Sequence, residues 1–178
     1  MRTLVRVGLS IVALIVIVVA VAYLDGMTLP VNHTTTITGT VAAAPAKVFA
    51  LIANPAAGPI WRPAVKSVQV LAPVYGPQGD LDHWTEDLGH GQTMTFLATR
   101  SEPPTRRDVL LDVPGASYGG TWTYEVAPGP TPNTTTLKIT ETGFINPPLY
   151  RFMMLHIIGM THNLDVYMKD MQAEAPKL

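Results

Sequence analysis

One acidic side chain stands on a strand face that is otherwise apolar. Residues 137–147 have the sequence LKITETGFINP, and the alternation of a strand places Leu137, Ile139 and Glu141 on one face. A buried carboxylate is stable only when it is paired, hydrogen-bonded or neutral. Glu141 is therefore the first candidate for proton transfer, or for a polar contact with a ligand.

A second titratable group lies in a helical pattern near the C-terminus. Its apolar stripe at i, i+3 and i+4 spacing consists of Leu149, Met153, His156, Met160, Leu164, Tyr167 and Met171. We expect His156 to point inward with this stripe, where it could pair with Glu141 and transfer protons. The alternative for Glu141 is a structural role near the Gly143 turn, with a bond to a backbone N–H or to Arg151, and the pattern favours this role over catalysis.

Two further motifs are weaker indications of a chemical site. HWTEDLGH (83–90) would place His83, Glu86, Asp87 and His90 on one face of a helix, as in a metal site, but GPQGD and GHG on either side predict hairpin turns. In a strand His83 and Glu86 point to opposite faces, so we expect neither a metal site nor a cofactor. GASYG (115–119) matches the nucleophile elbow around Ser117, which requires a strand, a turn and a helix. The strand pattern GTWTYEV follows instead, and a loop is expected.

Alternating apolar side chains on the expected strands are candidates for a pocket wall. Trp122 and Tyr124 share one face, and Met94 and Phe96 share another, whereas Trp61 and Trp84 are expected to be packing anchors. The full set of expected ligand-binding residues is Met94, Phe96, Trp122, Tyr124, Glu141, Met153, His156 and Met160.

The elements that must position these residues follow from the patterns. A strand is expected over 33–43, a helix from Pro45 to the Asn54-Pro55 pair, and a short helix or turn over 56–65. Six strands are expected at 65–73, 81–88, 92–100, 105–113, 119–127 and 134–143. Their hairpin-length connections predict an antiparallel sheet. One long helix of about 27 residues should then cover the sheet, well above the average helix length.

The N-terminus has the pattern of a membrane anchor. Arg2 and Arg6 precede an uncharged apolar run over residues 7–24, which ends at Asp25. At about 1.5 Å per residue this helix just crosses a bilayer core. The flanking arginines predict a cytoplasmic N-terminus and a domain on the periplasmic or extracellular side. A cleaved signal peptide is the alternative, because Ala20-Val21-Ala22 is an A-x-A pattern, but the run is longer than a signal-peptide core.

Length and charge limit the remaining possibilities. The 178 residues predict one domain plus an appendage: an anchor at 1–24, a linker at 25–32 and a domain at 33–178. The formal net charge is -1, which gives no clustered basic surface for nucleic acid. The chain contains no Cys, so disulfides, thiolate metal sites and cysteine nucleophiles are excluded.

The element order, together with three phrases, resembles a known superfamily. The phrases are APAKVFALIANPAAGPIWRPAV, TETGFINP and NLDVYMKDMQAEA, and the likeness spans residues 33–175. The chain is similar to the START-like polyketide cyclase/dehydrase and lipid-transport superfamily, also called SRPBCC. The resemblance implies an α+β helix-grip fold. In this fold an antiparallel sheet of about seven strands wraps around a long C-terminal helix, and an apolar cavity lies between the sheet and the helix. Members bind lipids, sterols or polyketides, and only some of them are enzymes.

These expectations combine into one leading hypothesis and two alternatives. The leading hypothesis is a single-pass membrane protein, held in the bilayer by residues 7–24, that binds a hydrophobic small molecule or lipid. One alternative is a cyclase or dehydrase that uses Glu141 and His156. The other is an accessory subunit of a larger membrane complex, in which the protein's own side chains fill the cavity.

Overall fold

A seven-stranded antiparallel sheet dominates the domain. The computed structural model describes residues 2–76, 79–111 and 115–178. The strands of the sheet are β1 (Asn32–Val41), β2 (Ser67–Val70), β5 (His83–Asp87), β6 (Thr93–Glu102), β7 (Arg106–Leu111), β8 (Tyr118–Pro128) and β9 (Thr135–Ile145). They are ordered β1-β9-β8-β7-β6-β5-β2, with every pair antiparallel. The expected sheet of about seven strands is confirmed.

The expected strand at 65–73 is shorter than predicted. It ends as β2 at Val70, and the chain then forms a separate two-stranded sheet from β3 (Val74–Gly76) and β4 (Gly79–Leu81). Pro73 lies between β2 and β3, and a proline cannot donate a hydrogen bond to a strand ladder.

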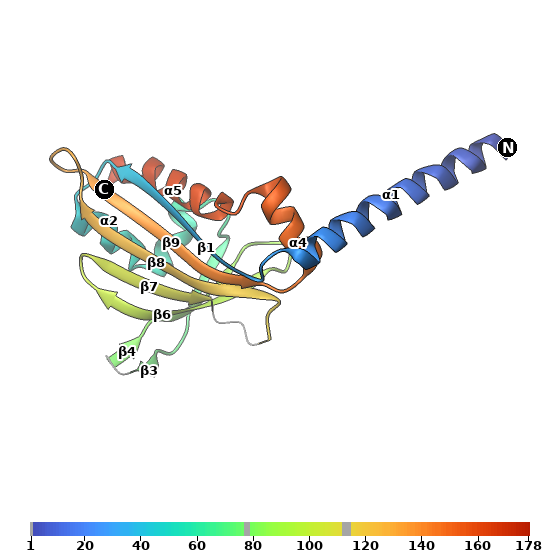
Figure 1. Ribbon diagram of the computed structural model, residues 1–178. Helices are drawn as coiled ribbons and strands as arrows, with labels where there is room; N and C mark the ends of the chain where they lie inside the picture. Colours follow the sequence, from blue (N-terminus) through green and yellow to red (C-terminus); the bar gives the residue numbers. More distant parts are fainter. Residues whose placement is uncertain (1, 77–78, 112–114) are drawn as a thin grey trace.

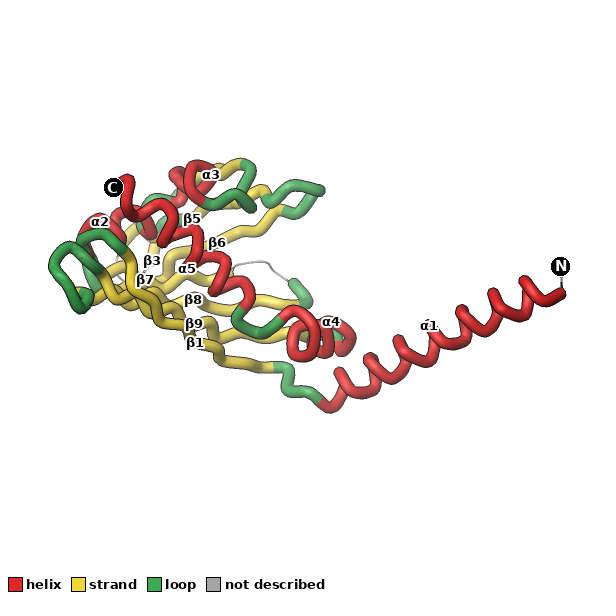
Figure 2. The backbone as a smooth tube through the Cα atoms, turned by 90° about the horizontal axis from the view of Figure 1, so that it is seen from above, coloured by secondary structure: helices red, strands yellow, loops and turns green. Residues whose placement is uncertain are grey.

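Short helices cover one face of the sheet. They are α2 (Pro45–Ile52), η1 (Pro55–Ala57) and α3 (Gly58–Trp61), and they lie on the same side as the C-terminal helix α5 (His162–Glu174), which ends in the short turn η3 (Ala175–Lys177) (Figures 1 and 2). Pro45 occupies the first helical turn of α2, as predicted. The core lies between these helices and the sheet, and its fully buried members include Val41, Val48, Leu137, Ile139, Leu164 and Met171. Each such side chain contributes roughly 1.5–3 kcal/mol relative to an exposed one.

The C-terminal helix is interrupted, which corrects the prediction of one continuous helix. The segment consists of α4 (Pro148–Met153), a π-helical turn η2 (Met154–Ile158), and α5. Gly159 ends the π turn with φ of 101°, a conformation that glycine adopts without steric cost. Because the helix restarts in a new direction at His162, residues before and after Gly159 do not share one stripe.

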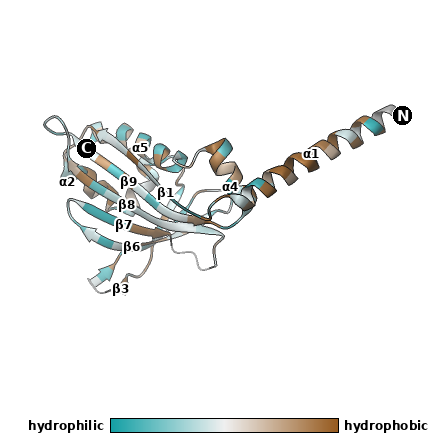
Figure 3. Ribbon diagram, viewed as in Figure 1, coloured by the Kyte–Doolittle hydropathy of each residue, from teal (hydrophilic) through white to brown (hydrophobic). Residues whose placement is uncertain are grey.

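The N-terminal helix α1 (Arg2–Thr28) extends away from the sheet and is apolar along most of its length (Figures 1 and 3). Within the described residues, Val5–Thr28 is long and apolar enough to cross a membrane. The helix continues four residues beyond the expected end at residue 24. Only residues 29–31 therefore connect it to β1.

The end of α1 packs against α4. The Arg151 Nε donates a hydrogen bond to the Gly26 carbonyl oxygen at 2.9 Å, and the His156 Nε2 lies 3.0 Å from the Asp25 Oδ2. Gly26 packs directly against Pro148, so a Cβ added at Gly26 would overlap the Pro148 carbonyl oxygen. These contacts fix the direction in which α1 leaves the domain.

Candidate functional site

A cavity of about 530 Å³ lies between the sheet, α5 and the α2–α3 region. Six of the eight expected ligand-binding residues are part of its wall: Met94, Phe96, Trp122, Tyr124, Glu141 and Met160. Their role in binding stays a prediction. Met153 and His156 are not part of the wall, and their side chains are exposed, because Tyr150 and Met154 occupy the cavity face of this segment instead.

Aromatic rings form the middle of the wall. The Tyr167 ring contacts three others, with centroid distances of 5.1 Å to Trp61, 5.3 Å to Tyr124 and 5.8 Å to Trp122. Trp61 and Trp84 are buried, as expected of packing anchors, but both also line the cavity. A ligand in this space would therefore meet flat, rigid, mostly apolar surfaces.

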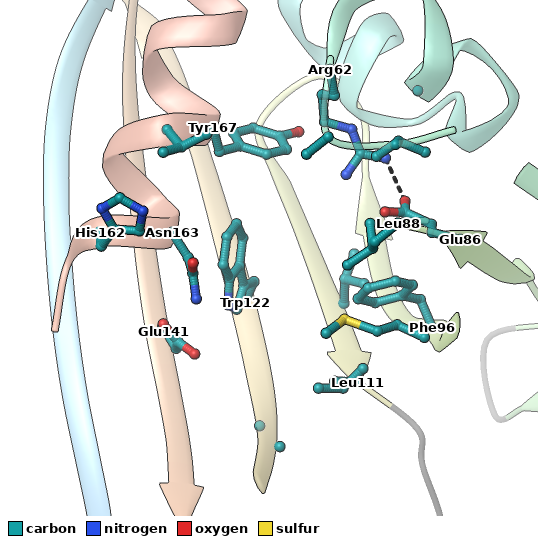
Figure 4. Close-up of a pocket in the computed structure, with 18 of the residues that line it drawn as sticks. Arg62, Glu86, Leu88, Phe96, Leu111, Trp122, Glu141, His162, Asn163 and Tyr167 are labelled. Atoms are coloured by element: carbon teal, nitrogen blue, oxygen red, sulfur yellow. Dashed lines mark hydrogen bonds and ion pairs between the residues drawn. The ribbon is translucent and has the colours of Figure 1, made fainter. Parts of the chain in front are cut away.

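One end of the cavity contains a buried ion pair that sequence patterns alone did not reveal. The Arg62 guanidinium donates a hydrogen bond to the Glu86 carboxylate, and the Trp84 Nε1 donates to the same Glu86 Oε1 at 3.0 Å (Figure 4). Glu86 is 4% exposed. Strand alternation could have placed Glu86 inward with Trp84, but its partner is 24 positions earlier in the chain.

The same end presents hydrogen-bond donors without acceptors. Among the described residues, the buried Trp61 Nε1 and Arg62 Nε have no partner, and both residues line the cavity. Unpaired buried donors are costly, and a ligand oxygen would relieve that cost. This end can therefore accept a carbonyl, hydroxyl or carboxylate oxygen.

Glu141 marks the opposite end of the cavity, and it lies on the inner face as predicted. Figure 4 shows it with His162 and Asn163 of α5, away from Arg62 and Glu86. Its carboxylate Oε1 lies 3.8 Å from the His33 Nε2. β1 runs antiparallel to β9 with His33 opposite Gly143. Glu141 is two residues from Gly143, so the side chains of His33 and Glu141 share the inner face.

Neither expected partner of Glu141 is its partner in the structure. His156 pairs instead with Asp25 on α1, and its side chain is 44% exposed. Arg151 donates from Nη1 to the carbonyl oxygens of Ile145 and Asn146, and from Nε to that of Gly26. Both residues therefore stabilise the junction between α1 and α4. The expected pairing of Glu141 with His156 is therefore not found, because Glu141 lies beside His33 and His156 beside Asp25.

The weaker motifs lie on strands and the turns beside them, and the last two residues of GASYG begin β8 instead of forming a loop. His83, Glu86 and Asp87 lie on β5, with His90 in the following turn, and alternation separates His83 from Glu86. Among the described residues, no group of three His, Cys, Asp or Glu could hold a metal ion. Ser117 precedes β8, and its carbonyl oxygen accepts a hydrogen bond from the Asn146 N–H. It is not followed by a helix.

Burial affects the titration of the tyrosines in the wall. Burial raises the pKa of Tyr167 to about 12, and burial followed by the neighbouring Tyr167 raises the pKa of Tyr124. At the other end, burial, Tyr118 and the Glu141 carboxylate raise the pKa of Tyr150. Tyr124, Tyr150 and Tyr167 are therefore uncharged near neutral pH.

Stability is expected to fall at alkaline pH because of Tyr167. An unfolded tyrosine has a pKa of about 10, so the unfolded chain releases a proton that folded Tyr167 keeps until about pH 12. This contribution is fully present below about pH 10 and is lost toward pH 12, at up to about 1.4 kcal/mol per pH unit. Thermal unfolding at about pH 9 and about pH 11 should show a smaller fall for Tyr167→Phe than for the unsubstituted protein. An equal fall in both would contradict the assignment.

Comparisons with known proteins agree with this architecture. A family model described as polyketide cyclase/dehydrase and lipid transport matches residues 32–174. A START superfamily protein from Mycobacterium smegmatis superposes with a TM-score of 0.62 at 18% identity, covering 82% of this chain and 98% of that one. The di-domain ARO/CYC BexL from the BE-7585A biosynthetic pathway gives 0.65 at 16% identity, covering 85% and 52%.

A plant enzyme has the same fold. Norcoclaurine synthase from Thalictrum flavum gives a TM-score of 0.61 at 12% identity, covering 87% of this chain and 92% of that one. These identities establish the fold alone. No curated protein matches the sequence.

Proposed function

Because the chain belongs to the polyketide cyclase/dehydrase and lipid transport family, we propose that it binds a hydrophobic small molecule or lipid in its cavity while α1 anchors it in a membrane. The observation that carries the proposal is the cavity itself, about 530 Å³ in volume, with aromatic walls and a polar group at each end. That combination suits an elongated apolar molecule with an oxygen at the Arg62 end.

The anchor and its orientation are the second part of the proposal. α1 contains the uncharged apolar run 7–24, within a segment long and apolar enough to cross a membrane, and Arg2 and Arg6 lie on the N-terminal side of that run. An excess of arginine favours the cytoplasmic side, which puts the domain on the periplasmic or extracellular face. Protease protection in sealed membrane vesicles tests this orientation. In vesicles with the cytoplasmic face outward, the domain after α1 should be protected, and digestion of that domain would reverse the orientation.

Filling the cavity is expected to abolish most of the binding. Val109 lies on β7, the central strand of the sheet, and its side chain lines the cavity. Val109→Trp should weaken binding of dansyl-undecanoic acid by about tenfold or more, since about 1.4 kcal/mol of lost contact is enough. The change is measured from dansyl emission excited directly, so that the added tryptophan does not contribute.

The neighbouring Leu110 provides the matched control. It alternates to the other face of β7 and is not part of the cavity wall. Leu110→Trp should leave the affinity unchanged, and melting temperatures of both variants verify that they fold. Equal affinities for the two folded variants, or no binding by the unsubstituted protein, would remove the support for the proposal.

A chemical step on the bound molecule is the second candidate. Glu141 faces the cavity 3.8 Å from His33, a carboxylate–imidazole pair of the kind that transfers protons. Several proteins of the same fold are named as aromatase/cyclases or synthases. Mass spectrometry of the ligand after incubation separates the two functions: an unchanged mass supports binding alone, and loss of water supports a dehydratase.

A further inference from the structure

Apolar side chains are exposed on the segment that joins α4 to α5. Met153, Leu155, Ile157 and Ile158 form this patch, with Ile157 70% exposed and Leu155 49% exposed. Figure 3 shows the hydrophobic colouring of this segment beside the end of α1. A water-soluble surface seldom displays several consecutive large apolar side chains on one short turn.

The patch cannot move freely relative to α1. His156, which lies within the patch sequence, is bound to Asp25, and Arg151 is bound to the Gly26 carbonyl oxygen. If α1 crosses a bilayer, Asp25 marks the end of its apolar run and lies at the membrane surface. A helix packed against that point lies within about one helix diameter, roughly 10 Å, of the same surface.

The other face of this segment belongs to the cavity. Tyr150 and Met154 line the cavity, together with Met160 just after the break and Tyr118 from the start of β8. The Tyr118 and Tyr150 rings lie 5.9 Å apart, and Tyr118 is 37% exposed. One short segment therefore separates the apolar patch from the interior of the cavity.

We propose that α4 and η2 lie in the membrane interface, with the patch of Met153, Leu155, Ile157 and Ile158 inserted among the lipids. The cavity then takes up its ligand directly from the bilayer, through the end lined by Tyr118 and Tyr150. The occupant of the patch is a lipid surface rather than a protein, because α4 packs against the end of α1, where Leu24 and Met27 are also exposed. Tyrosines at that level match the aromatic belts of membrane interfaces. The uptake route depends on the proposed cavity function, whereas insertion of the patch does not.

Insertion is tested with single labels, which the absence of native cysteine makes straightforward. Ile157→Cys carries the probe, and Ile60→Cys is the control: Ile60 is 79% exposed and lies on α3, away from α1 (Figure 2). Each full-length variant receives an NBD fluorophore and is reconstituted in phosphatidylcholine vesicles. We expect a blue shift and quenching by acyl-brominated phosphatidylcholine at position 157 only. Water-like emission without quenching at both positions would overturn the insertion.

Uptake is tested with Leu155→Asp/Ile157→Asp. All three tryptophans of the chain line the cavity, so energy transfer to dansyl-undecanoic acid reports its occupancy. The variant should bind the probe from detergent solution with unchanged affinity but load from vesicles more slowly, by about fivefold or more, because charged residues oppose interfacial binding. Equal loading rates would overturn the route. If the unsubstituted protein takes up no probe from either source, the cavity function fails instead, while the label result still decides insertion.

Discussion

Glu86→Leu is expected to lower the free energy of unfolding by about 3–5 kcal/mol, because it leaves the Arg62 charge buried without a partner. The Glu86 side chain is 5% exposed and the Arg62 side chain is 17% exposed, so bulk water solvates the pair poorly. Glu86 also accepts the Trp84 indole hydrogen bond, and the substitution would leave that donor unpaired as well. Urea denaturation of the full chain in mild detergent, followed by circular dichroism, measures the loss.

Two comparisons isolate the buried charge as the cause. Glu125 pairs with Lys138 on exposed strand positions, and Glu125→Leu should cost less than about 1 kcal/mol. Removing both charges with Arg62→Met/Glu86→Leu should recover most of the stability that Glu86→Leu loses, since no buried ion then remains. If Glu86→Leu lowered the free energy of unfolding as little as Glu125→Leu, the Arg62–Glu86 pair would not stabilise its end of the cavity.

Gly26→Ala is expected to open the junction between α1 and α4. The new Cβ would overlap the Pro148 carbonyl oxygen and lie 2.5 Å from its carbonyl carbon, both backbone atoms that cannot rotate away. Such overpacking typically costs about 1–3 kcal/mol. The amides of residues 149–158 should therefore exchange with deuterium about tenfold faster or more, since local opening governs their protection. Hydrogen exchange with mass spectrometry measures this directly.

Gly8→Ala is the matched control for this substitution. Gly8 lies in the same helix, and an added Cβ there would contact nothing within 4 Å. It gains the helix propensity of alanine without the clash, so exchange in 149–158 should stay unchanged. Identical exchange in both variants would mean that α1 and α4 tolerate a wider separation than their contacts indicate.

Local patterns predicted the sheet and the inward direction of Glu141, because strand alternation and turn residues act over a few positions. The break at Gly159 escaped the same reasoning. The apolar stripe of residues 149–171 continues across it in sequence, and one glycine with positive φ redirects the chain without changing the period. The expected inward positions of Met153 and His156 were derived from that unbroken stripe, and the structure places neither side chain in the cavity wall.

The partners of the charged residues were also out of reach, for a different reason. His33 meets Glu141 through the β1–β9 register, and Arg62 meets Glu86 through the packing of α3 on the sheet. Such pairs depend on the register of distant segments, which periodicity does not contain. Alternation in HTTTITGTV does place His33 on the face of Ile37 and Val41, so its inward position, though not its partner, was within reach.

Residues 29–31 are the whole connection between α1 and β1, and three extended residues span only about 10 Å. With α1 in a bilayer, this domain has no tether long enough to carry a molecule across the space beyond the membrane. It would meet donors and acceptors only by lateral diffusion within the same leaflet. The domain then encounters its partners in two dimensions. The abundance of other proteins in that membrane, rather than in the surrounding fluid, would therefore set the rate of ligand transfer.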